Sequence, residues 1–137
     1  MANFVYKKAK EALLNGQINV LSDQLKVLLL KKPDYTPNQD IDQHVSDIPV
    51  NAIIKRSEAI AEVSSTSGVL DAADVTIVEY NGSAFDAIAL YKYQPSDSDS
   101  KLIFYIDTSS GLPFEGSNSV NSVTIFWSDE STKILSL

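Results

Sequence analysis

Apolar residues recur every three or four positions near the start of the chain, with lysines and a glutamate between them: Phe4, Val5, Ala9, Ala12 and Leu13. This spacing puts them on one face of a helix, so it predicts a short amphipathic helix over residues 3–15. Asn3 is the expected N-cap. Gly16 is expected just after the C-terminus, because glycine adopts a left-handed backbone at little cost.

The apolar period then changes to two, which is typical of β-strands. Residues 17–20 and 24–29 are predicted to form two strands joined at Ser22-Asp23. Three prolines follow around the polar residues 33–49, and since proline lacks a backbone donor, this stretch is expected to be loop or very short elements. Residues 53–54 and the alternating residues 58–63 fit either a helix, which Ala and Glu favour, or a strand. We interpret them as strand, which ends in the serine-rich residues 64–68.

The second half has clearer strand patterns. Residues 75–80 and 84–93 are predicted to pair as a hairpin around Asn81-Gly82, a dipeptide that suits a turn with positive φ at both positions. Residues 101–107 form a further apolar run of strand length. The end of the chain, 123–127 and 132–137, is predicted to be a closing hairpin around Asp129-Glu130.

Seven to nine short strands separated by Ser, Gly, Pro and Asp turns indicate the fold class. We expect a mainly β protein: an antiparallel β-sandwich or jelly-roll-like domain with one short N-terminal α-helix. The helix either lies against the domain or reaches out of it. No repeat or linker divides the chain, so residues 1–16 are expected to be an N-terminal helix or arm and residues 17–137 a single β domain.

Composition and charge narrow the classes of function. The 137 residues carry a net charge of −7, which repels phosphate backbones, so nucleic acid is not an expected direct partner. The apolar runs are much shorter than the roughly 20 residues of a membrane span. Residues 1–8 have no apolar core before the lysines, so no secretory signal is expected. The absence of cysteine removes disulfides, thiolate metal sites and thiol nucleophiles.

His44 is the only histidine, and Asp42, Asp47 and several serines lie near it in the sequence. A catalytic triad needs such residue types, but the chain has no nucleophile-elbow pattern, so a loop histidine is the favoured interpretation. No catalytic residue is therefore assigned, and the chain is not expected to be an enzyme.

Two pairs of alternating aspartates have the spacing at which oxygen-ligand calcium loops begin, Asp97 with Asp99 and Asp40 with Asp42. The glycine and the terminal glutamate of an EF-hand loop are missing. Solvated turn acids are therefore favoured, and no metal or cofactor is expected.

Three stretches together resemble small virion structural proteins of tailed bacteriophages: GVLDAADVT at residues 68–76, LIFYIDTSSGLP at 102–113, and VTIFW at 123–127 leading to KILSL at 133–137. The opening, with LLNGQI at 13–18 and LKVLL at 25–29, is similar to theirs as well. The resemblance covers the first thirty residues and most of 68–137, whereas 31–67 matches only weakly. The loop 114–120 is longer and less glycine-rich than the corresponding turn of the family.

The resemblance is to head decoration (cement) proteins or other virion structural components. It implies a β-rich fold, symmetric oligomers and attachment to the outside of a capsid. The expected partner is the major capsid protein, the expected oligomer a homotrimer, and the expected location the capsid surface of the virion after synthesis in the host cytoplasm. Apolar and aromatic residues near both ends are the candidate interface: Phe4, Val5, Tyr6, Leu13, Phe114 and Trp127.

Two other functions remain open. One is a phage tail or fibre component that binds a host receptor or glycan, for which loops 96–100 and 114–120 are the first to examine. The other is a carbohydrate-binding module or sugar-active enzyme, because β-sandwiches often carry such functions and exposed aromatic rings stack on sugars.

Overall fold

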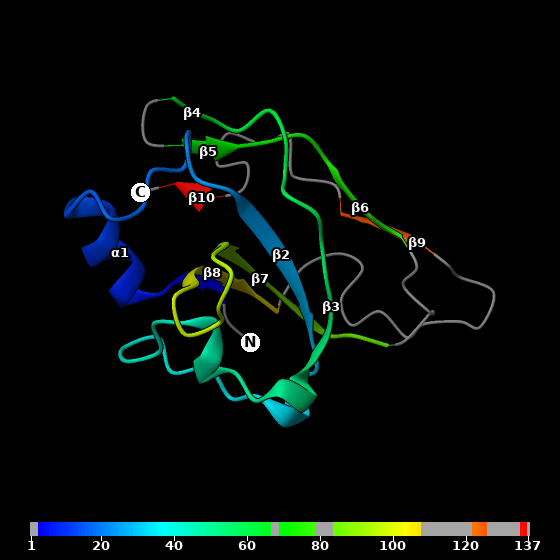
Figure 1. The fold of residues 1–137 in the computed structure, drawn as a ribbon. Coiled ribbons are helices and arrows are strands. Elements are labelled where there is room, and N and C mark those ends of the chain that lie inside the picture. The colour runs from blue at the N-terminus through cyan, green and yellow to red at the C-terminus, as the bar shows by residue number, and fades with distance from the viewer. Residues whose placement is uncertain (1–2, 67–68, 79–83, 108–121, 126–134, 137) are drawn as a thin grey trace.

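The computed structural model (Figure 1) describes residues 3–66, 69–78, 84–107, 122–125 and 135–136. This part is mainly β, with antiparallel sheets and one short helix, as the sequence predicts. The strands are β1 (Asn3–Val5), β2 (Leu25–Leu30), β3 (Ile53–Arg56), β4 (Ser64–Thr66), β5 (Val69–Asp71), β6 (Val75–Val78), β7 (Ala87–Lys92), β8 (Lys101–Ile106), β9 (Ser122–Ile125) and β10 (Leu135–Ser136). The helix is α1 (Lys7–Leu14), and three 3-10 turns are η1 (Lys32–Asp34), η2 (Val45–Asp47) and η3 (Val50–Ala52).

A five-stranded antiparallel sheet with the order β1-β8-β7-β2-β3 forms the centre of the molecule. Strand β2, between β7 and β3, is buried on both faces, which explains its nearly continuous apolar sequence, LKVLLL. Leu25, Val27 and Leu29 contribute to one core, and Leu28 and Leu30 contribute to the other.

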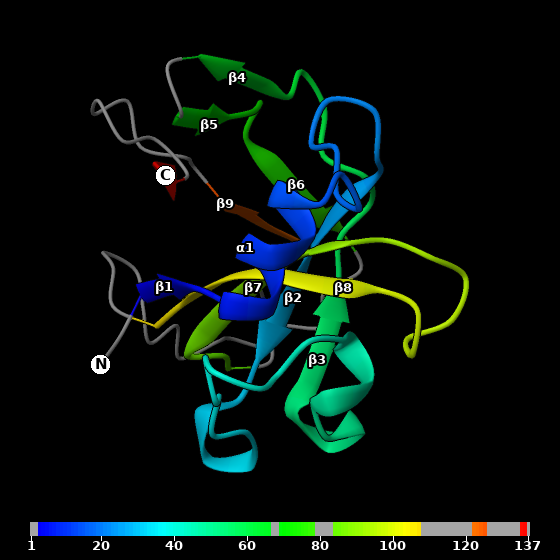
Figure 2. The ribbon, with the colours of Figure 1, turned by 90° about the vertical axis from the view of Figure 1, so that its left-hand side faces the viewer.

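The first core lies between this sheet and two smaller antiparallel sheets, β10-β5-β4 and β6-β9. Leu70 of β5 and Ile77 of β6 pack there with the odd-numbered leucines and valine of β2. Figures 1 and 2 show the smaller sheets on one side of the central strands, so the arrangement is sandwich-like.

The second core lies under residues 32–52, which cover the other face of the central sheet with η1, η2 and η3. Tyr35, Val45 and Ile48 are buried there. The predicted irregular character of this proline-containing stretch is therefore confirmed. Its apolar side chains nevertheless shield this face of the sheet from water.

The N-terminal segment differs from the predicted helix over residues 3–15. Residues 3–5 form β1, because Phe4 and Val5 pair with β8 in the register Phe4↔Tyr105 and Val5↔Phe104. The helix begins only at Lys7, and Tyr6 rather than Asn3 is its N-cap. Gly16 follows α1 with φ +75°, as expected. The helix lies against β8 and does not reach out of the domain (Figure 2).

Two predicted strands are absent. Residues 17–20 contain no strand, because Asn19 and Asp23 close a turn: the Asn19 N–H donates to the Asp23 carboxylate (2.7 Å) and the Asp23 N–H to the Asn19 carbonyl (2.8 Å). Residues 58–63 are not a strand either, since Glu62 adopts φ +56° and interrupts the extended backbone. The next strand is β4, which begins directly after this stretch, at Ser64.

The predicted hairpin pairings are also wrong. β7 has β2 on one side and β8 on the other, so β6 cannot pair with it and pairs with β9 instead. β10 pairs with β5 rather than with β9. The predicted turns at Asn81-Gly82 and Asp129-Glu130 lie outside the described residues.

Candidate functional site

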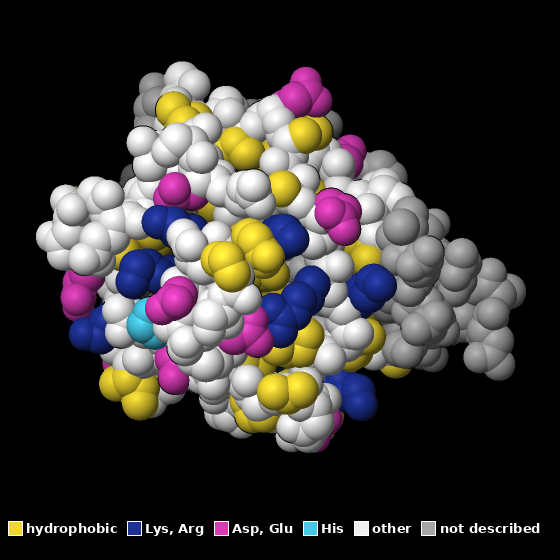
Figure 3. Space-filling view, viewed as in Figure 1, with side chains coloured by type: hydrophobic (Ala, Val, Ile, Leu, Met, Phe, Trp, Pro, Cys, Tyr) yellow, Lys and Arg dark blue, Asp and Glu magenta, His cyan; other side chains and the backbone are white. Residues whose placement is uncertain are grey.

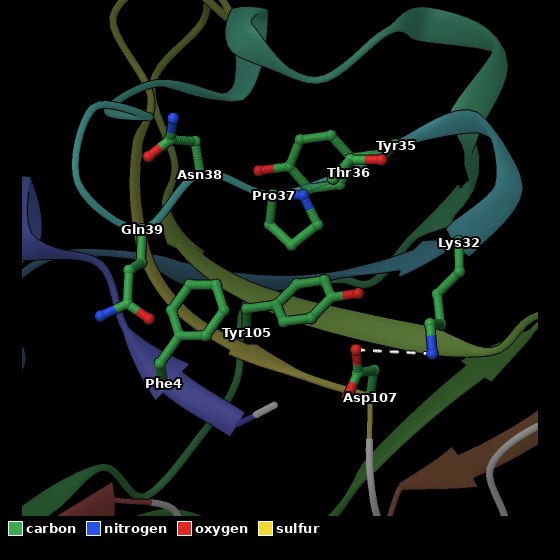
Figure 4. Close-up of a pocket in the computed structure, with 9 residues that line it drawn as sticks. All are labelled: Phe4, Lys32, Tyr35, Thr36, Pro37, Asn38, Gln39, Tyr105 and Asp107. Atoms are coloured by element: carbon green, nitrogen blue, oxygen red, sulfur yellow. Dashed lines mark ion pairs between the residues drawn. The ribbon is translucent and has the colours of Figure 1, made fainter. Parts of the chain in front are cut away.

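A pocket of about 710 Å³ opens where β1 and β8 meet the segment 32–39 (Figure 4). The sheet contributes Phe4 and Tyr105, with Asp107 just after β8. The covering segment contributes six residues: Lys32, Tyr35, Thr36, Pro37, Asn38 and Gln39. This volume is in the usual range for small-molecule sites.

The sheet wall of the pocket is aromatic because of the strand register. Phe4 and Tyr105 are direct cross-strand partners, and their rings stack with centroids 5.2 Å apart and planes 24° apart. Tyr35 meets Tyr105 edge-on, at 6.2 Å and 73°. Tyr35 and Tyr105 are almost fully buried, whereas Phe4 is half-buried and offers ring surface to the pocket.

A bulge in β8 makes this register possible. Leu90 pairs with Phe104 but Tyr91 pairs with Leu102, so Ile103 is an extra residue in β8. Ile103 and Phe104 therefore both pack toward the first core, and Tyr105 returns to the second-core face beside Phe4.

A chain of hydrogen bonds holds the covering segment. The Tyr35 hydroxyl donates to the Asp42 carboxylate (2.8 Å), so the Tyr6 hydroxyl donates to Tyr35 (2.9 Å). The Asn38 N–H donates to the same Asp42 oxygen (2.8 Å), and the Lys7 N–H to the Gln39 carbonyl (2.9 Å). Burial raises the pKa of both phenols above the ordinary value, and Tyr6 and Asp42 reinforce the shift at Tyr35.

One end of the pocket carries an ion pair. The Asp107 side chain is 6% exposed and lies 3.6 Å from the Nζ of Lys32, which is 42% exposed. The Asp107 N–H donates to the Asn3 side chain (3.0 Å). Burial, and then the negative charge of Asp107, raise the pKa of Tyr105. The other end, with Asn38 and Gln39, carries neutral amides.

The residues of the possible triad have other contacts. Asp47 accepts hydrogen bonds from the backbone N–H groups of Gln43 (2.9 Å) and His44 (3.0 Å). Partial burial raises the pKa of Asp47, but these two hydrogen bonds outweigh it and the net shift is downward. Asp42 is bound to Tyr35 and Asn38 instead. The carboxylates near His44 thus organise the local backbone.

The candidate calcium aspartates contact cations of the chain itself. Asp97 forms a two-pronged pair with Arg56 at 2.7 and 2.8 Å, and Asp40 pairs with Lys7 at 2.7 Å. Within the described residues, no group of three or more His, Cys, Asp or Glu side chains converges as metal ligands would.

The candidate interface residues occupy different environments. Phe4, Val5 and Leu13 are half-buried, and Tyr6 lies in the second core with no exposed surface. Phe114 and Trp127 lie outside the described residues. Among the described residues, the most exposed large apolar side chains are others: Leu14 (87%), Leu21 (62%), Ile41 (66%) and Val50 (81%).

Sequence reasoning missed the pocket and the exposed leucines. Leu14 does not lie on the apolar face of the predicted helix, and this position could have indicated from the sequence that its side chain is exposed. The pocket had no such signal, because Phe4 and Tyr105 come together only through the pairing of β1 with β8.

Neither a protein-family model nor a curated protein matches this chain. No helix in the described residues combines the length and the apolar character needed to cross a membrane.

Proposed function

We propose that this chain is a phage capsid decoration (cement) protein that binds the outside of the major capsid shell as a symmetric oligomer, a trimer, and stabilises the head. It acts by association and not by catalysis. A tail or fibre location is the rival within the same class. The resemblance of its strand and turn motifs to small virion proteins suggests the class, and the described parts of those motifs include residues of β5, β6, β8, β9 and β10.

The observation that carries the proposal is two exposed leucines, one at the end of α1 and one in the turn that follows it. Leu14 is 87% exposed and Leu21, in the turn that follows, is 62% exposed. The turn is held by hydrogen bonds, including Gln17 N–H to the Ala12 carbonyl (2.8 Å). Ordered apolar side chains of this kind favour burial against a protein partner. Figure 2 views the molecule from this side.

The charge pattern also favours a protein partner. The net charge is −7, and on the face shown in Figure 3 the basic side chains are interspersed with acidic ones. A phosphate backbone needs a continuous basic surface. An oligomer that contacts several shell subunits at once gains avidity. A contact of only two leucines per subunit can therefore be enough to hold the oligomer on the shell.

The proposal is tested by binding to heads that lack this protein, prepared from a phage with the gene deleted. The double variant Leu14→Ser, Leu21→Ser is compared with the wild type by co-sedimentation. Each buried leucine contributes about 1.5–3 kcal/mol, so the loss of both should weaken binding per subunit by at least about a hundredfold. The fold should be unchanged, because both side chains are exposed.

Val50→Ser is the matched control, since Val50 is 81% exposed but lies in η3, which packs against η1. It should bind like the wild type. Absence of wild-type binding to heads would contradict the decoration role. Wild-type affinity of the double variant would contradict the assignment of the contact to the end of α1.

A further inference from the structure

The pocket beside β1 and β8 has groups that the proposed capsid contact does not use. Phe4 precedes α1, whereas Leu14 ends it, so the pocket and the exposed leucines are separate features of the surface. Figure 4 shows the Phe4 and Tyr105 rings along one side, Pro37 and Tyr35 opposite them, the amides of Asn38 and Gln39 at one end, and the Lys32–Asp107 pair at the other.

The polar groups of the pocket carry no net charge. Lys32 supplies donors and Asp107 supplies acceptors 3.6 Å away, and each amide of Asn38 and Gln39 supplies both. A bound anion would be repelled by the Asp107 carboxylate, and a bound cation would be repelled by the Lys32 ammonium group. A hydroxyl group both donates and accepts, so it can bridge the ion pair without leaving either charge unpaired.

The apolar part of the pocket needs a ligand with an apolar face. Half-buried Phe4 presents its ring with Tyr105 fixed behind it at 5.2 Å, and half-buried Pro37 lies opposite. A pyranose ring has C–H groups on one face and hydroxyls around its edge, which matches an aromatic wall with polar groups at both ends.

We propose that this pocket binds a neutral carbohydrate of one or two rings, either as a free sugar or as the end of a glycan chain. The walls are preorganised, which lowers the entropic cost of binding. Tyr6, Tyr35 and Asp42 fix the covering segment, and a backbone hydrogen bond from Lys32 to the Asp86 carboxylate fixes its start.

The test is nuclear magnetic resonance titration of the intact chain with methyl glycosides of glucose, galactose, mannose and N-acetylglucosamine, and with dextran as a neutral polysaccharide. At least one should shift the backbone amide signals of Thr36, Asn38 and Gln39 in a saturable way. Tighter binding of a methyl glycoside would indicate a free sugar as the ligand, and tighter binding of dextran would indicate the end of a glycan chain. Either result supports the proposal.

Two variants separate sugar binding from general apolar binding. Phe4→Leu keeps an apolar side chain but removes the ring, and Gln39→Ala removes an exposed amide. Each should weaken sugar binding about tenfold, the usual effect of one lost stacking or hydrogen-bond contact. Asn51→Ala, an exposed amide in η3 outside the pocket, should bind like the wild type.

Three outcomes would overturn the proposal. The first is that no neutral sugar shifts the pocket signals. The second is that a sialylated sugar or a short peptide binds there and the neutral sugars do not. The third is wild-type sugar affinity in both Phe4→Leu and Gln39→Ala. The melting temperature of each variant is measured first, and Gln39→Ala keeps the test valid if Phe4→Leu unfolds.

Discussion

Arg56 and Asp97 connect the edge strand β3 to the turn that follows β7. The guanidinium makes two hydrogen bonds to the carboxylate, at 2.7 and 2.8 Å, and both side chains are 38% exposed. The hydrogen bond from Arg56 lowers the pKa of Asp97, against a smaller opposing effect of burial. Because the pair is partly exposed, solvent screens it and its contribution to stability is modest.

Asp97→Asn should lower the free energy of unfolding by about 0.5–1 kcal/mol at neutral pH. A lowered native pKa stabilises the fold at pH values above the ordinary carboxyl value of 3.8. The difference between wild type and variant should therefore be complete at pH 6 to 7, begin to shrink as the pH falls below about 4, and vanish below the lowered native pKa of Asp97. Urea unfolding at several pH values measures it.

Asp99→Asn is the control for this prediction. Asp99 is exposed in the same turn, and its backbone N–H donates to the Ser96 carbonyl (3.0 Å), a bond that the substitution keeps. It should change stability by less than Asp97→Asn at every pH. An equal effect of the two substitutions would mean that the Arg56 pair contributes nothing specific.

At the scale of elements, β2 shows how the sheet is stabilised. Adjacent residues of this strand serve different cores: Leu28 packs into the second and Leu29 into the first, and neither is exposed. Burial on both faces is unusual for an antiparallel sheet, which commonly keeps one face in water. Here the smaller sheets cover one face of the central sheet, and residues 32–52 cover the other.

Leu28→Ala and Leu29→Ala should each lower the free energy of unfolding by about 2–5 kcal/mol, the usual cost of a cavity in a packed core. Lys26→Ala, in the same strand, removes a half-buried side chain that lies 3.9 Å from the Tyr93 ring centre and should cost about 1 kcal/mol or less. Denaturant unfolding compares them. A small effect of either leucine substitution would show that one face of β2 is not a core.

Local patterns predicted where several strands lie but not how they pair. The alternation around β2, β6, β7 and β8 is visible in the sequence, and the structure has strands there. Pairing depends on which edges are free, so β7 lies between β2 and β8 although β6 comes before it in the chain. At the N-terminus, pairing with β8 outweighed the helical spacing of Phe4 and Val5.

The same limit applies to the candidate site. Phe4 and Tyr105 are apolar strand residues in the sequence, and nothing local shows that their rings stack. Asp42 appeared as a possible ligand or triad acid, yet it supports Tyr35 and the wall of the pocket. Only long-range contacts reveal these roles.

For the molecule as a whole, the central sheet has little surface left for a partner. One face packs against the smaller sheets and the other under residues 32–52. Contacts to a partner must therefore use edges, loops and the end of α1. Leu14 at that end and Leu21 in the turn that follows are the contacts of the proposed attachment to a shell, and the pocket at β1 and β8 remains available for the proposed ligand.

Copy number on purified virions is the most direct test of the central claim. Quantitative mass spectrometry of the particles, with immunogold labelling to locate the protein, measures both amount and position. A decoration protein should be present in hundreds of copies distributed over the head. A few copies at the tail tip, or none on the particle, would contradict the decoration role.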